Sequence, residues 1–208
     1  GYLRGKVDYR VVTGRNPKKA KIDYDITPGH LFFLDSVAYK GFDATADSLL
    51  SRTRKHRLLR SGEAFSTSAL VAEQARIEAL MRNNGYYYFS PTYTTFFADT
   101  VAHPGYVQLQ VRPAAQRPAV AQRPWYIGHV YVTIRDENES NITGRLDRPG
   151  YTYFFPGQQI PLQPGVWRRS IQHMEGERFA AWAQKATVEH LYGLGIFSAM
   201  DVNYAPRD

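Results

Sequence analysis

The sequence contains no cysteine, which excludes disulfide bonds, thiolate metal ligands and thiol catalysis but does not distinguish a cytosolic protein from a periplasmic one. It also lacks any apolar run of about 18 residues and has no basic-then-apolar amino terminus, so we expect neither a membrane-spanning helix nor a secretory leader within these residues.

Motifs that carry enzymatic chemistry are missing as well. The sequence has no HExxH pair, P-loop, G-x-S-x-G elbow or G-x-G-x-x-G turn. No two histidines stand at metal-ligand spacing; the six are His30, His56, His103, His129, His173 and His190. We therefore expect a protein that is not an enzyme and that holds no metal and no cofactor.

What the sequence does contain is 43% hydrophobic residues in a chain of 208, with 15 tyrosines, most of them in alternating stretches typical of strands. Residues 2–12 and 20–26 alternate apolar with polar side chains around a turn at residues 13–17, which predicts a β-hairpin. Ile22, Tyr24 and Ile26 share one face, so we expect that face to be buried and the other to be wet. Because a lone hairpin is marginally stable, residues 1–29 are expected to close a module that begins upstream.

The segment 30–113 predicts one complete module. A strand at residues 30–39 precedes two helices, at about 44–60 and from 66 or 67 to 84. Gly85 ends the second helix, and strands at about 86–97 and 106–112 follow. The expected order is β-α-α-β-β, which is an α+β fold with a small three-stranded mixed sheet covered by two antiparallel helices.

The pattern then begins again. Residues 114–124 predict an extended linker rich in Ala, Gln, Arg and Pro, and residues 125–208 predict a second module. Its strand at 125–134 is followed by an insertion at 136–161 with a short aromatic stretch, then helices at 164–173 and 180–194 and a strand at 196–204. We expect this module to lack its last strand.

A binding hypothesis comes from Pro91, which falls inside the predicted strand 86–97. Proline is tolerated in sheets almost only at an edge, and an unpaired edge can accept an added polypeptide strand. The predicted polypeptide-binding residues are Tyr88, Phe89, Ser90, Pro91, Thr92, Tyr93, Thr94, Thr95 and Phe96.

A second hypothesis concerns the formal net charge of +7, whose densest run is a basic helix face formed by Arg52, Arg54, Lys55, Arg57 and Arg60. A solvated helix face is the simpler interpretation. The alternatives are a module that binds nucleic acid or an anionic surface, with nucleic acid the less expected partner, and a structural spacer without a binding role.

Several motifs resemble polypeptide-transport-associated (POTRA) domains. These are the G-x-x-F segments at 62–65 and 176–179, the R-I-x-x-L-x-x-x-x-G-Y pattern from Arg76 to Tyr86, and T-x-x-x-L-x-x-L-G-x-F from Thr187 to Phe197. More narrowly, residues 80–89 followed by 98–100 resemble the TamA/TamL-like branch of the BamA family found in Bacteroidetes.

The resemblance implies a periplasmic region that precedes an outer-membrane β-barrel outside this sequence. It also implies a role in the assembly, insertion or translocation of outer-membrane proteins. The partners it implies are unfolded outer-membrane protein precursors, chaperones or an inner-membrane assembly component. It brings no catalytic residue.

Overall fold

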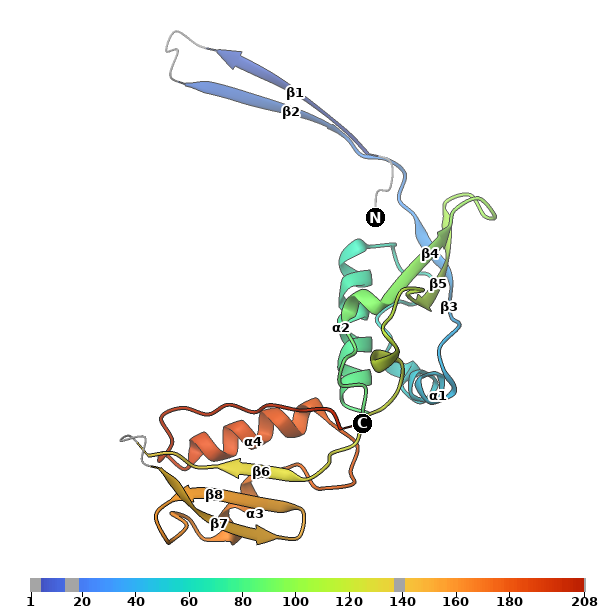
Figure 1. Cartoon of the computed structure of the whole chain (residues 1–208). Coiled ribbons are helices and arrows are strands. Elements are labelled where there is room, and N and C mark those ends of the chain that lie inside the picture. Colours follow the sequence, from blue (N-terminus) through green and yellow to red (C-terminus); the bar gives the residue numbers. More distant parts are fainter. Residues whose placement is uncertain (1–4, 14–18, 137–140, 208) are drawn as a thin grey trace. The chain divides into compact units, whose positions relative to one another are not determined.

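The computed structural model describes residues 5–13, 19–136 and 141–207. By their contacts the residues form two compact units, one made of 1–77 and 90–116 and the other of 78–89 and 117–208. Figure 1 labels their helices and strands in chain order. None of the described helices is both long and apolar enough to cross a lipid bilayer.

The first unit begins with the expected hairpin, whose turn at 14–18 lies outside the described residues. Strands β1 (Lys6–Thr13) and β2 (Ala20–Thr27) are antiparallel, and the apolar residues Val7, Tyr9 and Val11 lie opposite Ile26, Tyr24 and Ile22. The expectation of one buried face is wrong, because β2 is exposed along its whole length and Tyr9 and Val11 are exposed as well. A two-stranded sheet has no core of its own, and no third described strand joins this one.

A three-stranded sheet forms the rest of this unit. Strand β3 (Phe33–Tyr39) is followed by helices α1 (Ala44–Arg52) and α2 (Thr67–Arg82) and by strands β4 (Thr94–Asp99) and β5 (Tyr106–Pro113). The strand order is β3-β5-β4, with β3 parallel and β4 antiparallel to β5. The expected mixed sheet and element order are confirmed.

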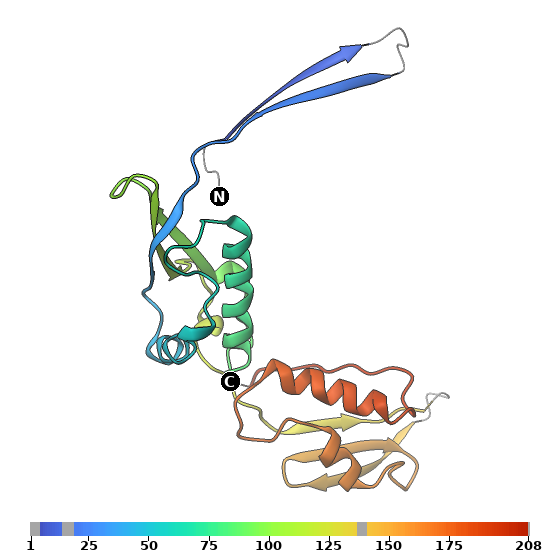
Figure 2. The same ribbon diagram turned by 180° about the vertical axis from the view of Figure 1, so that it is seen from behind.

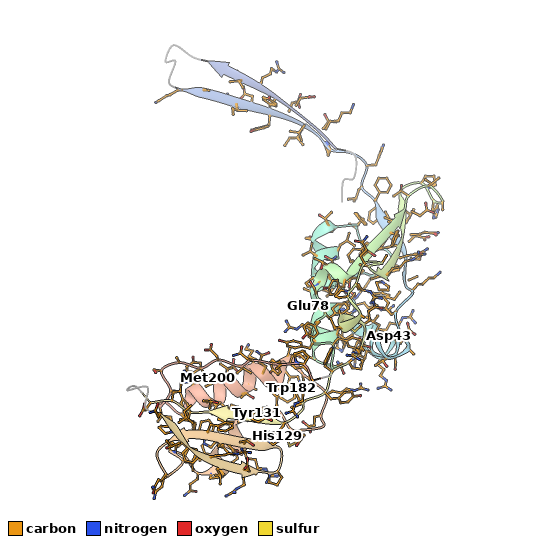
Figure 3. All side chains as sticks on the ribbon, in the orientation of Figure 1. Asp43, Glu78, His129, Tyr131, Trp182 and Met200 are labelled. Atoms are coloured by element: carbon orange, nitrogen blue, oxygen red, sulfur yellow. The ribbon has the colours of Figure 1, made fainter. Side chains whose placement is uncertain are left out.

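The core of this sheet follows from periodicity. Along β5, Val107, Leu109 and Val111 are buried while the residues between them are more exposed. Leu50 of α1 and Ile77 of α2 are fully buried as well. Helix α1 starts at the N-cap Asp43, which is labelled in Figure 3. Its carboxylate accepts hydrogen bonds from the backbone of Thr45 and Ala46.

Helix α1 is shorter than the predicted helix 44–60. It ends at Arg52, a 3₁₀ turn (η1, Arg54–His56) follows, and the chain continues without helix to α2. The hydroxyl of Thr53 donates to the Leu49 carbonyl at 2.9 Å, a local bond that occupies a helix-terminal acceptor.

The second unit contains β6 (Val130–Thr133), β7 (Ile142–Arg148), β8 (Tyr151–Pro156), α3 (Pro164–Ser170) and α4 (Ala181–Gly193), with α4 running alongside β6 in both views (Figures 1 and 2). Its strand order is β6-β8-β7, with β6 parallel and β7 antiparallel to β8. This arrangement reproduces β3-β5-β4, but the hairpin here precedes the helices.

The expected insertion at 136–161 therefore supplies the central strand. Phe33 and Lys40 donate backbone hydrogen bonds to the carbonyls of Gly105 and Val111, and Val130 and Ile134 donate in the same way to Gly150 and Phe154. Residues 196–204 do not form the predicted strand. The position beside β6 that a closing strand would take is already occupied by β8.

The core of this second sheet is largely aromatic. Tyr153, Phe155 and Trp167 are buried together with Leu191, and Phe197 packs against them from the segment that follows α4. Residues 196–204 thus contribute side chains to the core without adding a strand.

Candidate polypeptide-binding edge

The chain segment that precedes the candidate site begins at the end of helix α2. Gly85 has φ +103°, and the N–H of Tyr86 reaches back to the carbonyl of Met81 at 3.1 Å, as in a Schellman C-cap. A Cβ on residue 85 would lie 2.8 Å from Cβ of Pro124, so both the conformation and the space require glycine. The predicted helix end at this glycine is confirmed.

The strand does not start directly after Gly85, as predicted. Tyr86 and Phe89 are buried in a turn, with the Phe89 N–H bonded to the Tyr86 carbonyl at 3.0 Å. A 3₁₀ turn (η2, Pro91–Tyr93) follows, with Pro91 in its first turn, where a fixed φ and a missing donor cost little. Of the predicted binding residues, 88–93 precede the strand, and Thr94, Thr95 and Phe96 lie on it.

Strand β4 is nevertheless an edge strand, because it pairs with β5 on one side and ends the sheet order. Tyr93 accepts a hydrogen bond from Ala114, and the register places Thr94 opposite Pro113, which has no N–H. Antiparallel pairs alternate between bonded and non-bonded positions. The backbone N–H and C=O groups of Phe96 and Ala98 therefore point away from β5.

One end of this edge is already covered. The side-chain amide of Gln74 on α2 donates to the Thr94 carbonyl at 2.8 Å, which is the outward-pointing acceptor of the first strand residue. An added strand would form its backbone hydrogen bonds with the N–H and C=O groups of Phe96 and Ala98. Of the residues on this strand, Phe96 is among the predicted binding residues, whereas Phe97 and Ala98 are not.

The side chains of β4 suit an added strand of apolar or uncharged polar residues. From Thr94 to Ala98 the strand has no charge, and Asp99 ends it. Phe97 is 53% exposed, and its ring lies 5.0 Å from the guanidinium carbon of Arg112 on the neighbouring strand. Natural proteins protect edges with charges, so an uncharged edge with an exposed phenylalanine is unusual for a surface without a partner.

The opposite edge of the sheet is partly closed by the chain itself. Gly62 donates to the Leu34 carbonyl at 2.7 Å, and Leu34 donates back to Glu63 at 2.8 Å. Phe65, which is buried, donates to the carbonyl of Phe32 at 2.8 Å. We call residues 62–65 the G-x-x-F clamp. They bond to the backbone of Phe32 and Leu34, on the side of β3 that faces away from β5.

A second clamp repeats this geometry in the other unit. Gly176 donates to Ile127, Ile127 donates to Glu177, and buried Phe179 donates to Trp125, all between 2.7 and 2.9 Å. Gly62 and Gly176 both have positive φ, at 86° and 85°. The G-x-x-F motif thus has a specific structural role in both units.

The second sheet has a protected outer strand. β7 carries Arg145, Asp147 and Arg148, and its pairing with β8 shifts register between Ile142 and Gly144. Charges and irregular pairing both disfavour strand addition. β4 is therefore the better candidate of the two antiparallel edges.

The predicted basic residues lie elsewhere in the first unit, and they do not form one helix face. Arg52 is in the last turn of α1, Arg54 and Lys55 are in η1, and Arg60 is in the segment that follows. These four are exposed. Arg57 is only half-exposed, because its guanidinium carbon lies 3.9 Å from the ring centre of Tyr39.

No group of three or more His, Cys, Asp or Glu side chains suited to a metal ion occurs in the described part of the chain.

The chain was compared with known proteins. No family model matches the chain, and no curated relative matches it. Among solved structures, BamA POTRA3-5 of Haemophilus influenzae is 15% identical, with 97% of this chain and 66% of that one covered at a TM-score of 0.48. POTRA1-3 of Anabaena Omp85 is 14% identical, with 96% and 69% covered at a TM-score of 0.33.

A third structure, Haemophilus ducreyi BamA lacking POTRA domains 1-3, is 21% identical and covers 56% of this chain and 20% of that one at a TM-score of 0.42. The chain thus spans just under two thirds of the first of these structures. These identities and TM-scores are too low to assign a function.

Proposed function

We propose that this chain is a periplasmic array of POTRA-type modules in an outer-membrane assembly or translocation protein, and that β4 binds extended polypeptide by strand addition. The single observation that carries the binding proposal is the outer position of β4, with the backbone groups of Phe96 and Ala98 directed away from β5. The partner class is an unfolded outer-membrane precursor or an assembly partner that presents an extended segment.

The module assignment is supported by features that occur twice in the chain. In both sheets the first strand lies beside the central strand and parallel to it. In both units a G-x-x-F clamp bonds to the backbone near the start of that first strand. We therefore propose residues 30–113 and 125–208 as two modules joined by 114–124, with 1–29 as the closing hairpin of a further module. Within the proposed linker, η3 (Ala119–Gln122) forms a 3₁₀ turn.

The narrower placement in the TamA/TamL-like branch and in Bacteroidetes is also a proposal, supported by residues 80–89 and 98–100 of the sequence.

Strand addition is tested with a fluorescein-labelled ten-residue peptide of alternating Val and Thr, titrated by fluorescence anisotropy with the full chain. Ala98→Pro removes one outward N–H from the edge, whereas Ala98→Val keeps it and serves as the matched control. We expect at least tenfold weaker binding for the proline variant, near-normal binding for the valine variant, and little change in 0.5 M NaCl. Equal binding by both variants would contradict strand addition at β4.

A further inference from the structure

The first observation is how much of the chain's positive charge lies in one segment. Residues 52–60 contain five of the 26 Lys and Arg residues and none of the 19 Asp and Glu residues. Without these five, the formal net charge of +7 would fall to +2. We call residues 52–60 the basic loop.

The second observation is that the basic loop is fixed to the core. The N–H of Leu58 donates to a carboxylate oxygen of fully buried Glu73 at 2.9 Å, and Leu59 is 3% exposed. Arg57 stacks on Tyr39, whose hydroxyl donates to the same carboxylate. The loop therefore presents its other cations from a held backbone, which reduces the ordering entropy lost on binding.

The third observation concerns the acidic partners of these cations. In the described residues no carboxylate lies within salt-bridge distance of Arg52, Arg54, Lys55 or Arg60, although Lys21, Arg82 and Lys185 all have such partners. The C-terminal dipole of α1 accounts for a preference for cations in its last turn, where Arg52 lies. It does not account for Lys55 or Arg60, which lie beyond that turn.

The fourth observation distinguishes between classes of anionic partner. Leu58 is 45% exposed in the middle of the cations, and the basic loop contains no Phe, Tyr or Trp. Single-stranded nucleic acid is bound by cations together with aromatic side chains that stack on bases. An apolar side chain between cations instead suits a membrane interface, where cations contact phosphates and the apolar group enters the boundary with the acyl chains.

We propose that the basic loop docks the first unit onto an anionic phospholipid surface, with Arg52, Arg54, Lys55 and Arg60 contacting headgroup phosphates and Leu58 entering the interface. This contact is independent of strand addition at β4. The chain would bind polypeptide through one surface and bilayer through another.

The test is co-sedimentation of the full chain with vesicles of phosphatidylcholine alone or with 30% phosphatidylglycerol. We expect binding only to the mixed vesicles, and loss of binding in 0.5 M NaCl as the charges are screened. The double variant Arg54→Glu with Lys55→Glu should bind at least about 20-fold more weakly, since each cation near an anionic surface contributes about fivefold. Arg168→Glu with Arg169→Glu makes the same charge change at two adjacent exposed arginines and should bind like the parent.

Leu58→Ser tests the apolar contact, with Val71→Ser at another exposed aliphatic position of the first unit as its control. We expect a severalfold loss for the first and no change for the second. Equal losses in the two charge-reversed variants would overturn the proposal, because total charge would then explain binding. Binding to a 30-nucleotide single-stranded DNA without binding to mixed vesicles would overturn it as well.

Discussion

The hydroxyl of Tyr39 donates a 2.5 Å hydrogen bond to the carboxylate of Glu73, which has no exposed surface. The same carboxylate receives two bonds from the Arg76 guanidinium, at 2.6 and 2.9 Å, and the one from the Leu58 backbone. A strand, the basic loop and helix α2 thus meet at one buried charge.

Removal of this carboxylate should be strongly destabilising. Glu73→Ala leaves the Arg76 guanidinium and the Leu58 N–H without their acceptor, and breaking a buried ion pair typically costs about 3–5 kcal/mol. We expect a loss of this size in urea unfolding followed by circular dichroism. Glu78→Ala, which removes a partly exposed carboxylate of the same helix, should cost less than about 1 kcal/mol. Similar losses for both would show that Glu73 is not a structural centre.

The stability of the first unit should fall in acid for the same reason. Burial opposes ionisation of Glu73, but hydrogen bonds from Arg76, Tyr39 and Leu58 outweigh it and hold the pKa of this carboxyl below its usual range. Because the folded pKa lies below the unfolded value of about 4.3, the stabilisation is complete above that pH and is lost as pH falls through the folded pKa. Urea unfolding from pH 7 to 3 should show a smaller acid loss for Glu73→Gln than for the parent. Parallel profiles would contradict this assignment.

A second acid-sensitive contact lies in the other unit. Burial lowers the pKa of His173, and Nε2 of its ring is hydrogen-bonded to the hydroxyl of Tyr204 at 2.7 Å. In the unfolded chain a histidine takes up its proton near pH 6.5, so stability is complete above that pH and falls as pH drops towards the lower folded pKa. We expect the free energy of unfolding of this unit to depend less on pH between 7 and 5 in His173→Phe than in the parent. Tyr204→Phe should lower this free energy at pH 7. An unchanged pH profile in His173→Phe would exclude this contact as the cause.

The C-cap of helix α2 gives a prediction with an internal control. Gly85→Ala places a methyl group at a residue with positive φ and against Pro124. We expect it to lower the free energy of unfolding by about 1–3 kcal/mol. Gly193→Ala, at the end of α4 where nothing lies within 4 Å of an added Cβ, should be neutral or stabilise by up to about 1 kcal/mol. Thermal unfolding of the two variants should shift in opposite directions or by clearly different amounts.

Local patterns predicted the end of α2 and the alternation of β5 well, and they predicted the length of α1 and the sheets less completely. The end of α2 at Gly85 and the alternation of Val107, Leu109 and Val111 depend on neighbouring residues, and both are confirmed. The start of β4 was predicted eight residues too early. The aromatic residues 86–89 have strand propensity, but burial of Tyr86 and Phe89 in a turn decides their conformation.

The second sheet shows where sequence alone was insufficient. The strand that pairs with β6 is distant from it in the sequence, and the alternation of apolar and polar residues does not determine which strand that is. One available indication was that Gly150-Tyr151 repeats Gly105-Tyr106, with a positive-φ glycine ahead of the central strand in both cases. The outward positions on β4 could not be found without the register opposite Pro113.

The G-x-x-F clamp also limits how this protein can aggregate. A continuous stack of sheets needs two long open edges on every copy, so that each copy extends the stack by receiving one neighbour and offering a place to the next. Residues 62–65 bond to the backbone of Phe32 and Leu34 at the start of β3, so part of the outer edge of this strand is already covered. The clamp therefore shortens one of the two edges through which copies of this sheet could stack, whereas the outer edge of β4 is covered only at Thr94.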